Sequence, residues 1–263
     1  MNPWLLAGVA TALLCLLFVG VYLLARRLNN YGIVDVAWSY AFTVVAFVYG
    51  FAGSGTLSRR IVLTSLVTLW SVRLGTHLYV RVMSHHPVED GRYQLLRRDW
   101  AHDFDRKMFG FFQMQAVSVV VLSAPLLVAL NHRAPAWHAL EIAGVVVWLI
   151  ALGGESLADA QLQRFKRDPD NRGKVCTVGL WRYSRHPNYF FEWLVWVGYA
   201  LIALAAPWGW VGLASPVIML YLLLRVTGIP LTEEQSIRSK GDAYRAYQRT
   251  TSRFVPWFPR RET

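Results

Sequence analysis

The sequence has 263 residues, of which 55% are hydrophobic and 16% are charged, and its formal net charge is +11. In soluble domains about a quarter of the residues are charged, so this composition excludes an ordinary soluble domain and favours a membrane protein. The positive charge does not indicate a nucleic-acid partner, because the Lys and Arg residues lie in short loops between long apolar stretches.

In chain order, about seven apolar stretches are long enough to cross the hydrocarbon core of a bilayer as helices. They run over residues 3–25, 31–51, 61–80, 109–130, 136–158, 189–206 and 208–224. None shows the alternation of polar and apolar residues that strands of a transmembrane barrel need. The sequence therefore predicts an all-α, polytopic membrane protein, a bundle of about seven transmembrane helices.

The Lys and Arg residues are distributed unevenly between alternate loops. Loops of one parity and the tail, which runs to Arg261, hold most of them, and the opposite loops hold only Arg59, Arg60 and Arg133. Because cytoplasmic loops carry the excess of Lys and Arg, we predict an N-terminus outside and a C-terminus in the cytoplasm. The expected location is a bacterial inner membrane or the endoplasmic reticulum, with the active site facing the cytoplasm.

We expect one domain over residues 1–263, because no internal repeat or linker is visible. The tail over residues 232–250 (TEEQSIRSKGDAYRAYQRT) has the charges and tyrosines of a helix that lies on the membrane surface.

Ionisable and amide residues occur inside the predicted spans, almost all in the cytoplasmic half. Each ionisable group at mid-bilayer costs about 2.5–3.5 kcal/mol on insertion scales, so each is a candidate functional residue. The i, i+4 spacing puts Glu155 and Asp159 on one helix face, and Asn188 and Glu192 on another. Snorkelling toward the headgroups would explain any single residue, whereas a water-accessible cavity open to the cytoplasm explains them together. The candidates are Asp35, Arg73, Glu155, Asp159, Asn188 and Glu192.

The loop over residues 164–186 (RFKRDPDNRGKVCTVGLWRYSRH) is strongly basic. Pro187, which follows it, suits the first turn of a helix, where the positive end of the dipole favours an anion. We therefore predict that loop and helix start hold a ligand with several negative charges, such as a nucleotide. The candidates in the loop are Lys166, Lys174, Arg182, Tyr183, Arg185 and His186.

Motifs of several other chemistries are absent from the sequence. There is no G-x-G-x-x-G or Walker loop, so a nucleotide must lie between helices, and the Gly153-Gly154 pair is interpreted as helix packing. There is no HExxH motif, and Cys15 and Cys176 lie far apart, so we predict neither a metal site nor a disulfide.

The segment over residues 179–193, GLWRYSRHPNYFFEW, resembles the membrane-embedded steroid 5-alpha-reductase family and, more distantly, the isoprenylcysteine carboxyl methyltransferases. The likeness extends over roughly residues 155–206. It implies a seven-helix fold with NADPH as cofactor. By this resemblance, Asn188 and Glu192 would hold the nicotinamide end, and Asp159 would bind ribose or amide groups. The residues that would meet phosphates are Arg73, Arg92, Lys166, Lys174 and Arg182.

The N-terminal half departs from the family pattern. The reductases grip the substrate ketone with a Glu on the second helix and a Tyr on the third, whereas this sequence has Asp35 and Trp70. We predict Asp35 and Tyr93, which belongs to the Glu-Asp-Gly-Arg-Tyr segment, as the catalytic residues. A buried, neutral Asp35 is the alternative proton donor.

The resemblance implies reduction of a carbon–carbon double bond conjugated to a ketone, with hydride delivered to the β carbon while an acid polarises the carbonyl. The expected substrate is a 3-oxo-4-ene steroid or similar lipid that enters a monomeric enzyme from the bilayer. The alternative is a lipid or isoprenyl methyltransferase that uses S-adenosylmethionine, indicated by Arg185-His186-Pro187 and Glu233-Glu234. A lipid-binding or transport protein is a third class, and it would need polar groups in the outer half of the helices.

Overall fold

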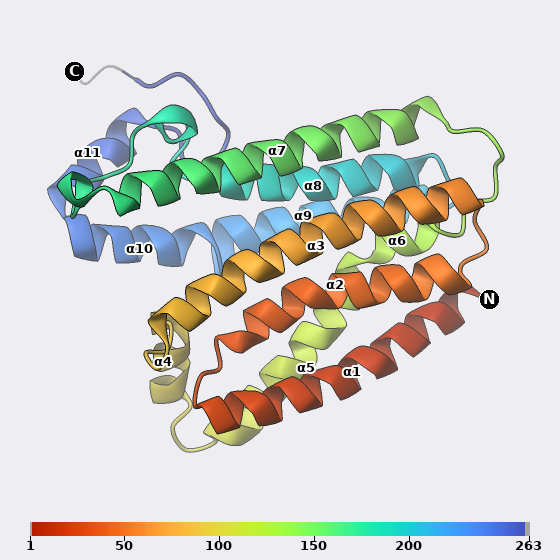
Figure 1. Ribbon diagram of the computed structural model, residues 1–263, viewed down its shortest axis with the longest axis horizontal. Helices are drawn as coiled ribbons and strands as arrows, with labels where there is room; N and C mark the ends of the chain where they lie inside the picture. Colours follow the sequence, from red (N-terminus) through yellow and green to blue (C-terminus); the bar gives the residue numbers. More distant parts are fainter. Residues whose placement is uncertain (1, 261–263) are drawn as a thin grey trace. The chain divides into compact units, whose positions relative to one another are not determined.

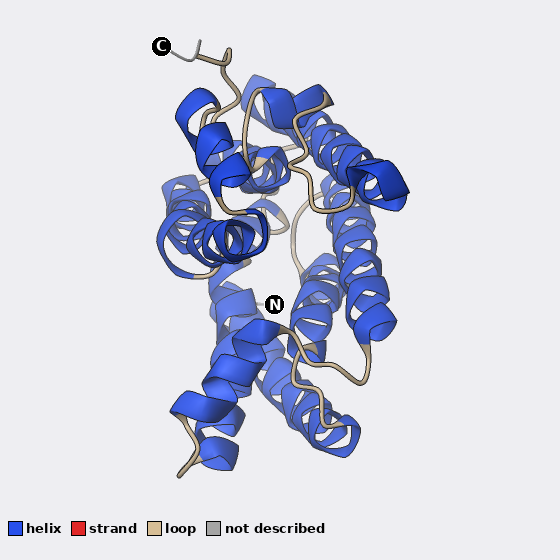
Figure 2. Cartoon of the chain, turned by 90° about the vertical axis from the view of Figure 1, so that its left-hand side faces the viewer, coloured by secondary structure: helices blue, strands red, loops and turns tan. Residues whose placement is uncertain are grey.

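The structure is a computed structural model that describes residues 2–260. Figures 1 and 2 show helices joined by loops. Of the described residues, 78% are helical and none belongs to a strand. The all-α prediction is confirmed. Arg261 and the other tail residues to 263, like residue 1, lie outside the described residues.

The chain forms two compact units. Unit 1 comprises the residues up to Trp137 together with Ala206–Val211, and unit 2 comprises His138–Ala205 and the residues from Gly212 onward. That residues 1–263 form a single domain stays a prediction.

Unit 1 is built from three long and three shorter helices. α2 packs against α3, and α1 packs against α2 and α5 (Figure 1). Asn2 caps α1 by accepting a hydrogen bond from the Trp4 N–H at 2.9 Å, and Asn29 ends it in the left-handed conformation. The helices are α1 (Pro3–Leu28), α2 (Ile33–Ala52), α3 (Leu57–His85), α4 (Gly91–Asp99), α5 (Phe104–Leu122) and α6 (Ala124–Ala129).

Unit 2 is built around α7 and α8, which lie side by side (Figure 1). α8 also contacts α9, and α10 contacts α11. The α-helices are α7 (Ala139–Arg167), α8 (Pro187–Leu204), α9 (Ala214–Tyr221), α10 (Ile229–Lys240) and α11 (Asp242–Thr250). The short 3-10 helices are η1 (Pro169–Asn171), η2 (Gly179–Arg182) and η3 (Gly209–Leu213, at the boundary with unit 1), and the π-helix η4 (Leu222–Val226) continues α9.

Five helical segments among the described residues are long and apolar enough to cross a membrane, and the chain is an integral membrane protein. The predicted fourth span is interrupted, because α5 ends at Leu122 and α6 begins at Ala124. The total of seven spans and the orientation of the termini therefore stay predictions. The segments are Pro3–Leu28, Ile33–Ala52, Leu57–His85, Ala139–Arg167 and Gly209–Lys240.

The surface helix predicted over residues 232–250 is replaced by two helices. α10 ends at Lys240, and α11 begins at Asp242. Gly241 between them has φ 56° and ψ −128°, a backbone conformation that residues with a side chain avoid.

Glycines bring α7 and α8 into close contact. A Cβ on Gly144 would lie 2.7 Å from the carbonyl oxygen of Gly198, and a Cβ on Gly154 would lie 2.4 Å from the ring of Phe191. Small residues of this kind let helix backbones approach in a membrane. The packing interpretation is confirmed for Gly154, whereas a Cβ on Gly153 would meet no atom within 4 Å.

Gly144→Ala is expected to destabilise the protein, because the added methyl must displace backbone atoms of α8, and overpacking costs about 1–3 kcal/mol. Gly153→Ala in the same helix is the matched control. It should be neutral or stabilise by up to about 1 kcal/mol, since Ala favours the helix. Thermal unfolding in detergent compares the two variants, and equal melting temperatures would contradict the close α7–α8 contact.

Candidate functional site

Unit 1 brings Asp35, Arg92 and Tyr93 together. Asp35 lies in the first turn of α2, and the other two residues lie at the start of α4. The Tyr93 hydroxyl donates a hydrogen bond to Asp35 Oδ1 at 2.8 Å, and Arg92 forms an ion pair with Asp35 Oδ2. Arg92 Nη2 also donates to the Tyr93 oxygen at 3.2 Å. The two residues predicted to be catalytic therefore share one hydrogen-bond network.

Glu89 anchors the start of α4 to the turn between α1 and α2. Its carboxylate accepts hydrogen bonds from the Tyr31 N–H at 2.6 Å and from Arg97 Nε at 3.1 Å. Asp90 caps α4 by accepting from the Arg92 N–H at 3.0 Å. The Asp90 cap could be read from the sequence, because Asp precedes a helix start. The Glu89 contact could not, because no local spacing connects it with residue 31.

Burial keeps the proton on Tyr93. The residue is fully buried, and this burial raises the pKa of its phenol well above the usual value, with a further increase from the Asp35 carboxylate and an opposing effect of Arg92. The Asp35 carboxylate raises the pKa of Arg92, which therefore stays positively charged. Tyr93 can thus act as a hydrogen-bond donor or acid at neutral pH.

Two further residues of interest lie on α3 in unit 1. Trp70 is fully buried and packs against Phe42, with ring centroids 5.2 Å apart. Trp70 is therefore a core residue. Arg73 is half-buried on the same helix, and its contact with a phosphate stays a prediction.

Unit 2 brings polar residues of α7 and α8 together. Asn188 Nδ2 donates a hydrogen bond to Asp159 Oδ1 at 3.4 Å. Glu155, one turn before Asp159, is buried, and so is Glu192, which accepts from Trp196 Nε1 at 3.1 Å. The polar stripes predicted on these two helices therefore meet at Asp159 and Asn188.

The loop before α8 is fastened to α7. Gln161 Oε1 accepts a hydrogen bond from the Leu180 N–H at 2.8 Å, and Trp181 Nε1 donates to the carbonyl oxygen of Ala158 at 2.9 Å. Gly179 has φ 58°, and a Cβ there would lie 2.4 Å from the Gln161 amide, so the turn requires glycine. These contacts bring the start of α8 beside the C-terminal half of α7.

Arg185 and His186 have partners inside unit 2. Arg185 Nε donates to Glu233 Oε1 at 2.7 Å, and its Nη1 donates to the carbonyl oxygens of Gln248 at 3.0 Å and Thr251 at 2.7 Å. His186 Nε2 lies 3.3 Å from the same Glu233 oxygen, and burial lowers the pKa of this imidazole. Both side chains contact α10, and Arg185 also contacts residues around the end of α11. Contact of either residue with a cofactor stays a prediction.

The remaining basic candidates lie around the loop after α7. Lys174 and Arg182 line an open pocket of about 780 Å³. Lys166 lies near Cys176; burial raises the pKa of the Cys176 thiol, and Lys240 and Lys166 oppose this increase. Among the residues from 2 to 260, no group of three or more His, Cys, Asp or Glu side chains is arranged to hold a metal ion.

Tyr183, another candidate of the loop, is held by the C-terminal segment. Its carbonyl oxygen accepts a hydrogen bond from the Trp257 N–H at 2.8 Å. Its ring contacts Phe258 edge-on, with centroids 6.0 Å apart. Contact of Tyr183 with a cofactor stays a prediction.

The chain is a membrane protein of a family described as "Protein of unknown function (DUF1295)", which matches residues 21–251. This family includes steroid 5-alpha-reductase-like proteins. That the chain itself is such a reductase stays a prediction. The chain is also similar to uncharacterized protein C594.04c of Schizosaccharomyces pombe, with 27% identity over 296 residues that cover 97% of this chain and 80% of the relative. No solved structure matches the chain.

Glu233→Gln is expected to destabilise the protein, because it leaves the buried Arg185 without its counter-charge, and breaking a buried ion pair costs about 3–5 kcal/mol. Glu234→Gln is the matched control. Glu234 is exposed and pairs with Arg238 on the surface, so its removal should cost less than about 1 kcal/mol. Thermal unfolding of both purified variants in one detergent measures the difference, and equal stabilities would rule out the buried pair.

Proposed function

We propose that this chain is an NADPH-dependent, membrane-embedded reductase of a carbon–carbon double bond conjugated to a ketone. Its substrate is a hydrophobic molecule, such as a 3-oxo-4-ene steroid or similar lipid, that enters from the bilayer. The observation that carries the proposal is the buried Tyr93 phenol, which keeps its proton and is held between Asp35 and Arg92. Membership of a family that includes steroid 5-alpha-reductase-like proteins supports it.

The polar groups of unit 2 fit the nicotinamide end of a dinucleotide. The Asn188 amide offers donors and an acceptor, and Asp159 and Glu192 offer acceptors, which suits a carboxamide with an N–H₂ and a carbonyl. His186 gives α8 no side-chain cap, so the dipole of this helix favours an acceptor oxygen at its start. When bound, NADPH supplies the hydride.

We assign fewer residues to the cofactor phosphates than the resemblance implies. Lys166 and Arg73 keep the expected phosphate contact. Arg92 is assigned to the tyrosine, because its guanidinium pairs with Asp35. Arg185 and His186 are assigned to the support of α8, since both contact Glu233 and Arg185 also donates to two backbone carbonyl oxygens.

Tyr93 is assigned as the acid that polarises the substrate carbonyl. Asp35 accepts the phenol hydrogen bond in the absence of substrate, and this hydrogen turns to the carbonyl oxygen when the ketone binds. The positive charge of Arg92 then stabilises the negative charge that develops on the oxygens beside it. In this proposal Asp35 orients the phenol. It does not donate the proton itself, as in the alternative considered from the sequence.

A methyltransferase that uses S-adenosylmethionine is the second candidate. It is favoured by one observation, the meeting of Arg185 and His186 with Glu233. In that case the three side chains would give up their contacts with one another and bind S-adenosylmethionine. Transfer of labelled methyl groups by membranes that hold the protein, with no response to NADPH, would favour this candidate.

Oxidation of NADPH in the presence of progesterone, followed at the nicotinamide absorbance band in detergent, tests the acid. Tyr93→Phe should lower kcat by about 10²–10⁴-fold, the usual contribution of a general acid, and leave NADPH binding unchanged. Tyr40→Phe, which removes a hydroxyl bonded to Thr76 elsewhere in unit 1, is the matched control and should keep full activity. Full activity of Tyr93→Phe would refute the assignment.

Asn188→Leu tests the cofactor site separately. The change keeps a similar volume and removes the amide that pairs with Asp159, so NADPH binding should weaken by about tenfold or more, the effect of about 1.4 kcal/mol. Quenching of protein fluorescence on titration with NADPH measures the affinity. If the wild-type protein binds no NADPH even without substrate, the reductase proposal is lost.

A further inference from the structure

The open pocket of about 780 Å³ in unit 2 is positively charged. Lys174 and Arg182 contribute positive side chains, and none of the described residues that line the pocket is acidic. Thr177, Thr250 and Thr251 are the other polar residues of the lining with aliphatic hydroxyls, and the Thr250 hydroxyl bonds to backbone carbonyls of its own helix. Two positive charges with no acidic residue in the described lining suit the phosphate of a ligand.

One face of α11 forms a wall of this pocket. Ala243, Ala246, Tyr247 and Thr250 line it, and their i, i+3, i+4, i+7 spacing puts them on the same side of the helix. The small alanines leave room for a bound group, and the Tyr247 hydroxyl is already engaged, since it donates to the Ser184 carbonyl oxygen at 3.1 Å. The pocket is therefore a fixed feature of the contact between α11 and the loop.

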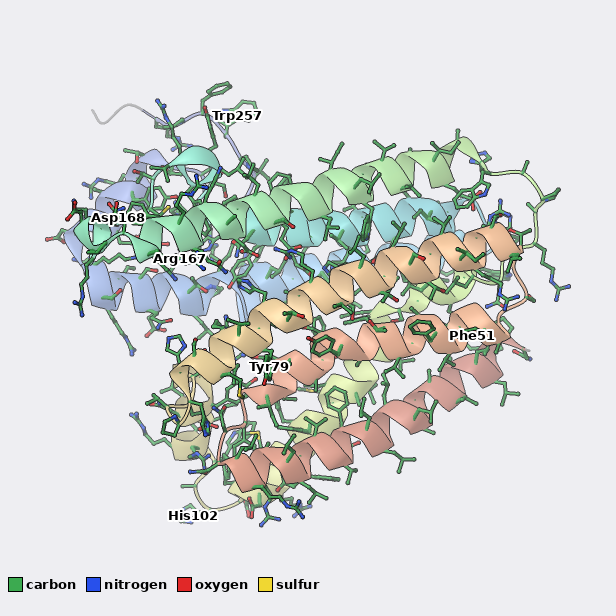
Figure 3. All side chains as sticks on the ribbon, viewed as in Figure 1. Phe51, Tyr79, His102, Arg167, Asp168 and Trp257 are labelled. Atoms are coloured by element: carbon green, nitrogen blue, oxygen red, sulfur yellow. The ribbon has the colours of Figure 1, made fainter. Side chains whose placement is uncertain are left out.

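Apolar side chains continue from the rim of the pocket. Pro259 lines it, and the preceding Val255, Trp257 and Phe258 are 53%, 69% and 74% exposed. Figure 3 shows Trp257 projecting from unit 2 at the level of the C-terminal part of α7, not beyond the end of that helix. Exposed aromatic side chains of membrane proteins gather where hydrocarbon meets the headgroups.

These exposed rings belong to a segment with a defined course. Ser184 Oγ donates a hydrogen bond to the carbonyl oxygen of Phe254, and the Trp257 N–H donates to that of Tyr183, each at 2.8 Å. The Arg260 N–H donates to a carbonyl oxygen at the end of α11, also at 2.8 Å. The segment is thus fastened at three points with its aromatic rings held outward.

We infer that this pocket binds the phosphate of an anionic phospholipid headgroup. Lys174 and Arg182 pair with the phosphate, and the exposed apolar side chains beside Pro259 lie at the boundary between headgroups and acyl chains. Cytoplasmic leaflets attract basic segments through their anionic lipids. The resemblance assigns both cations to cofactor phosphates instead, but the described lining includes none of Asp159, Asn188 and Glu192. This inference goes beyond the proposed function and does not depend on it.

Native mass spectrometry of the full chain in detergent tests the inference, with phosphatidylglycerol and phosphatidylcholine of identical acyl chains added in turn. The wild-type protein should retain phosphatidylglycerol in preference. Lys174→Gln with Arg182→Gln should reduce that preference by about fivefold for each charge removed. Arg98→Gln with Lys107→Gln is the matched control, because it also removes one arginine and one lysine, from exposed positions of unit 1. This control should keep the preference for phosphatidylglycerol.

The NADPH affinity of the same variants distinguishes a lipid phosphate from a cofactor phosphate. The inference requires it to be unchanged in the Lys174 and Arg182 variant. An NADPH Kd raised by about tenfold in that variant overturns the inference and assigns the pocket to the cofactor. An unchanged lipid preference also overturns it. If the protein binds no NADPH, the lipid result decides alone, and if the double variant unfolds, the two single variants decide.

Discussion

A charged side chain among apolar helices needs a partner, and each unit of this chain contains a carboxylate that has one. In unit 1, Asp35 pairs with Arg92 and accepts a hydrogen bond from Tyr93. In unit 2, Glu233 pairs with Arg185. The first contact joins the start of α2 to α4, and the second joins α10 to the start of α8. These ion pairs therefore fix the positions of the side chains to which we assign chemistry.

The two ion pairs differ in their access to solvent, and this difference separates their roles. The side chains of Arg92 and Asp35 are 27% and 23% exposed, whereas those of Arg185 and Glu233 are 9% and 13% exposed. The first pair is the more exposed of the two. The second pair has further hydrogen bonds to backbone carbonyls and holds the C-terminal helices, so its role is structural. This contrast agrees with our proposal, which assigns the reacting group to unit 1 and a supporting role for the start of α8 to the pair in unit 2.

The sequence predicts those features that depend on neighbouring residues. Apolar runs predict α1, α2, α3 and α7, because burial in hydrocarbon is a property of a continuous stretch, and i, i+4 spacing predicts the polar stripes that meet at Asp159 and Asn188. Contacts between distant residues are different. Arg185 and Glu233 are 48 residues apart, and no period connects them. The break at Gly241 does have a local signal, since glycine between Lys and Asp favours a helix end. The charged residues on both sides of Gly241 favour one continuous helix, and this pattern outweighs a single glycine in a prediction from sequence.

Binding of NADPH to the folded protein is the property on which the proposed chemistry depends. A ligand that prefers the folded state stabilises it, by about 2.7 kcal/mol at a concentration 100 times its Kd. The most direct measurement is therefore the melting temperature of the purified protein in detergent with NADPH or with S-adenosylmethionine. We expect NADPH to raise it and S-adenosylmethionine to leave it unchanged. A melting temperature that does not respond to NADPH would contradict the assignment of Asp159, Asn188 and Glu192 to a nicotinamide cofactor.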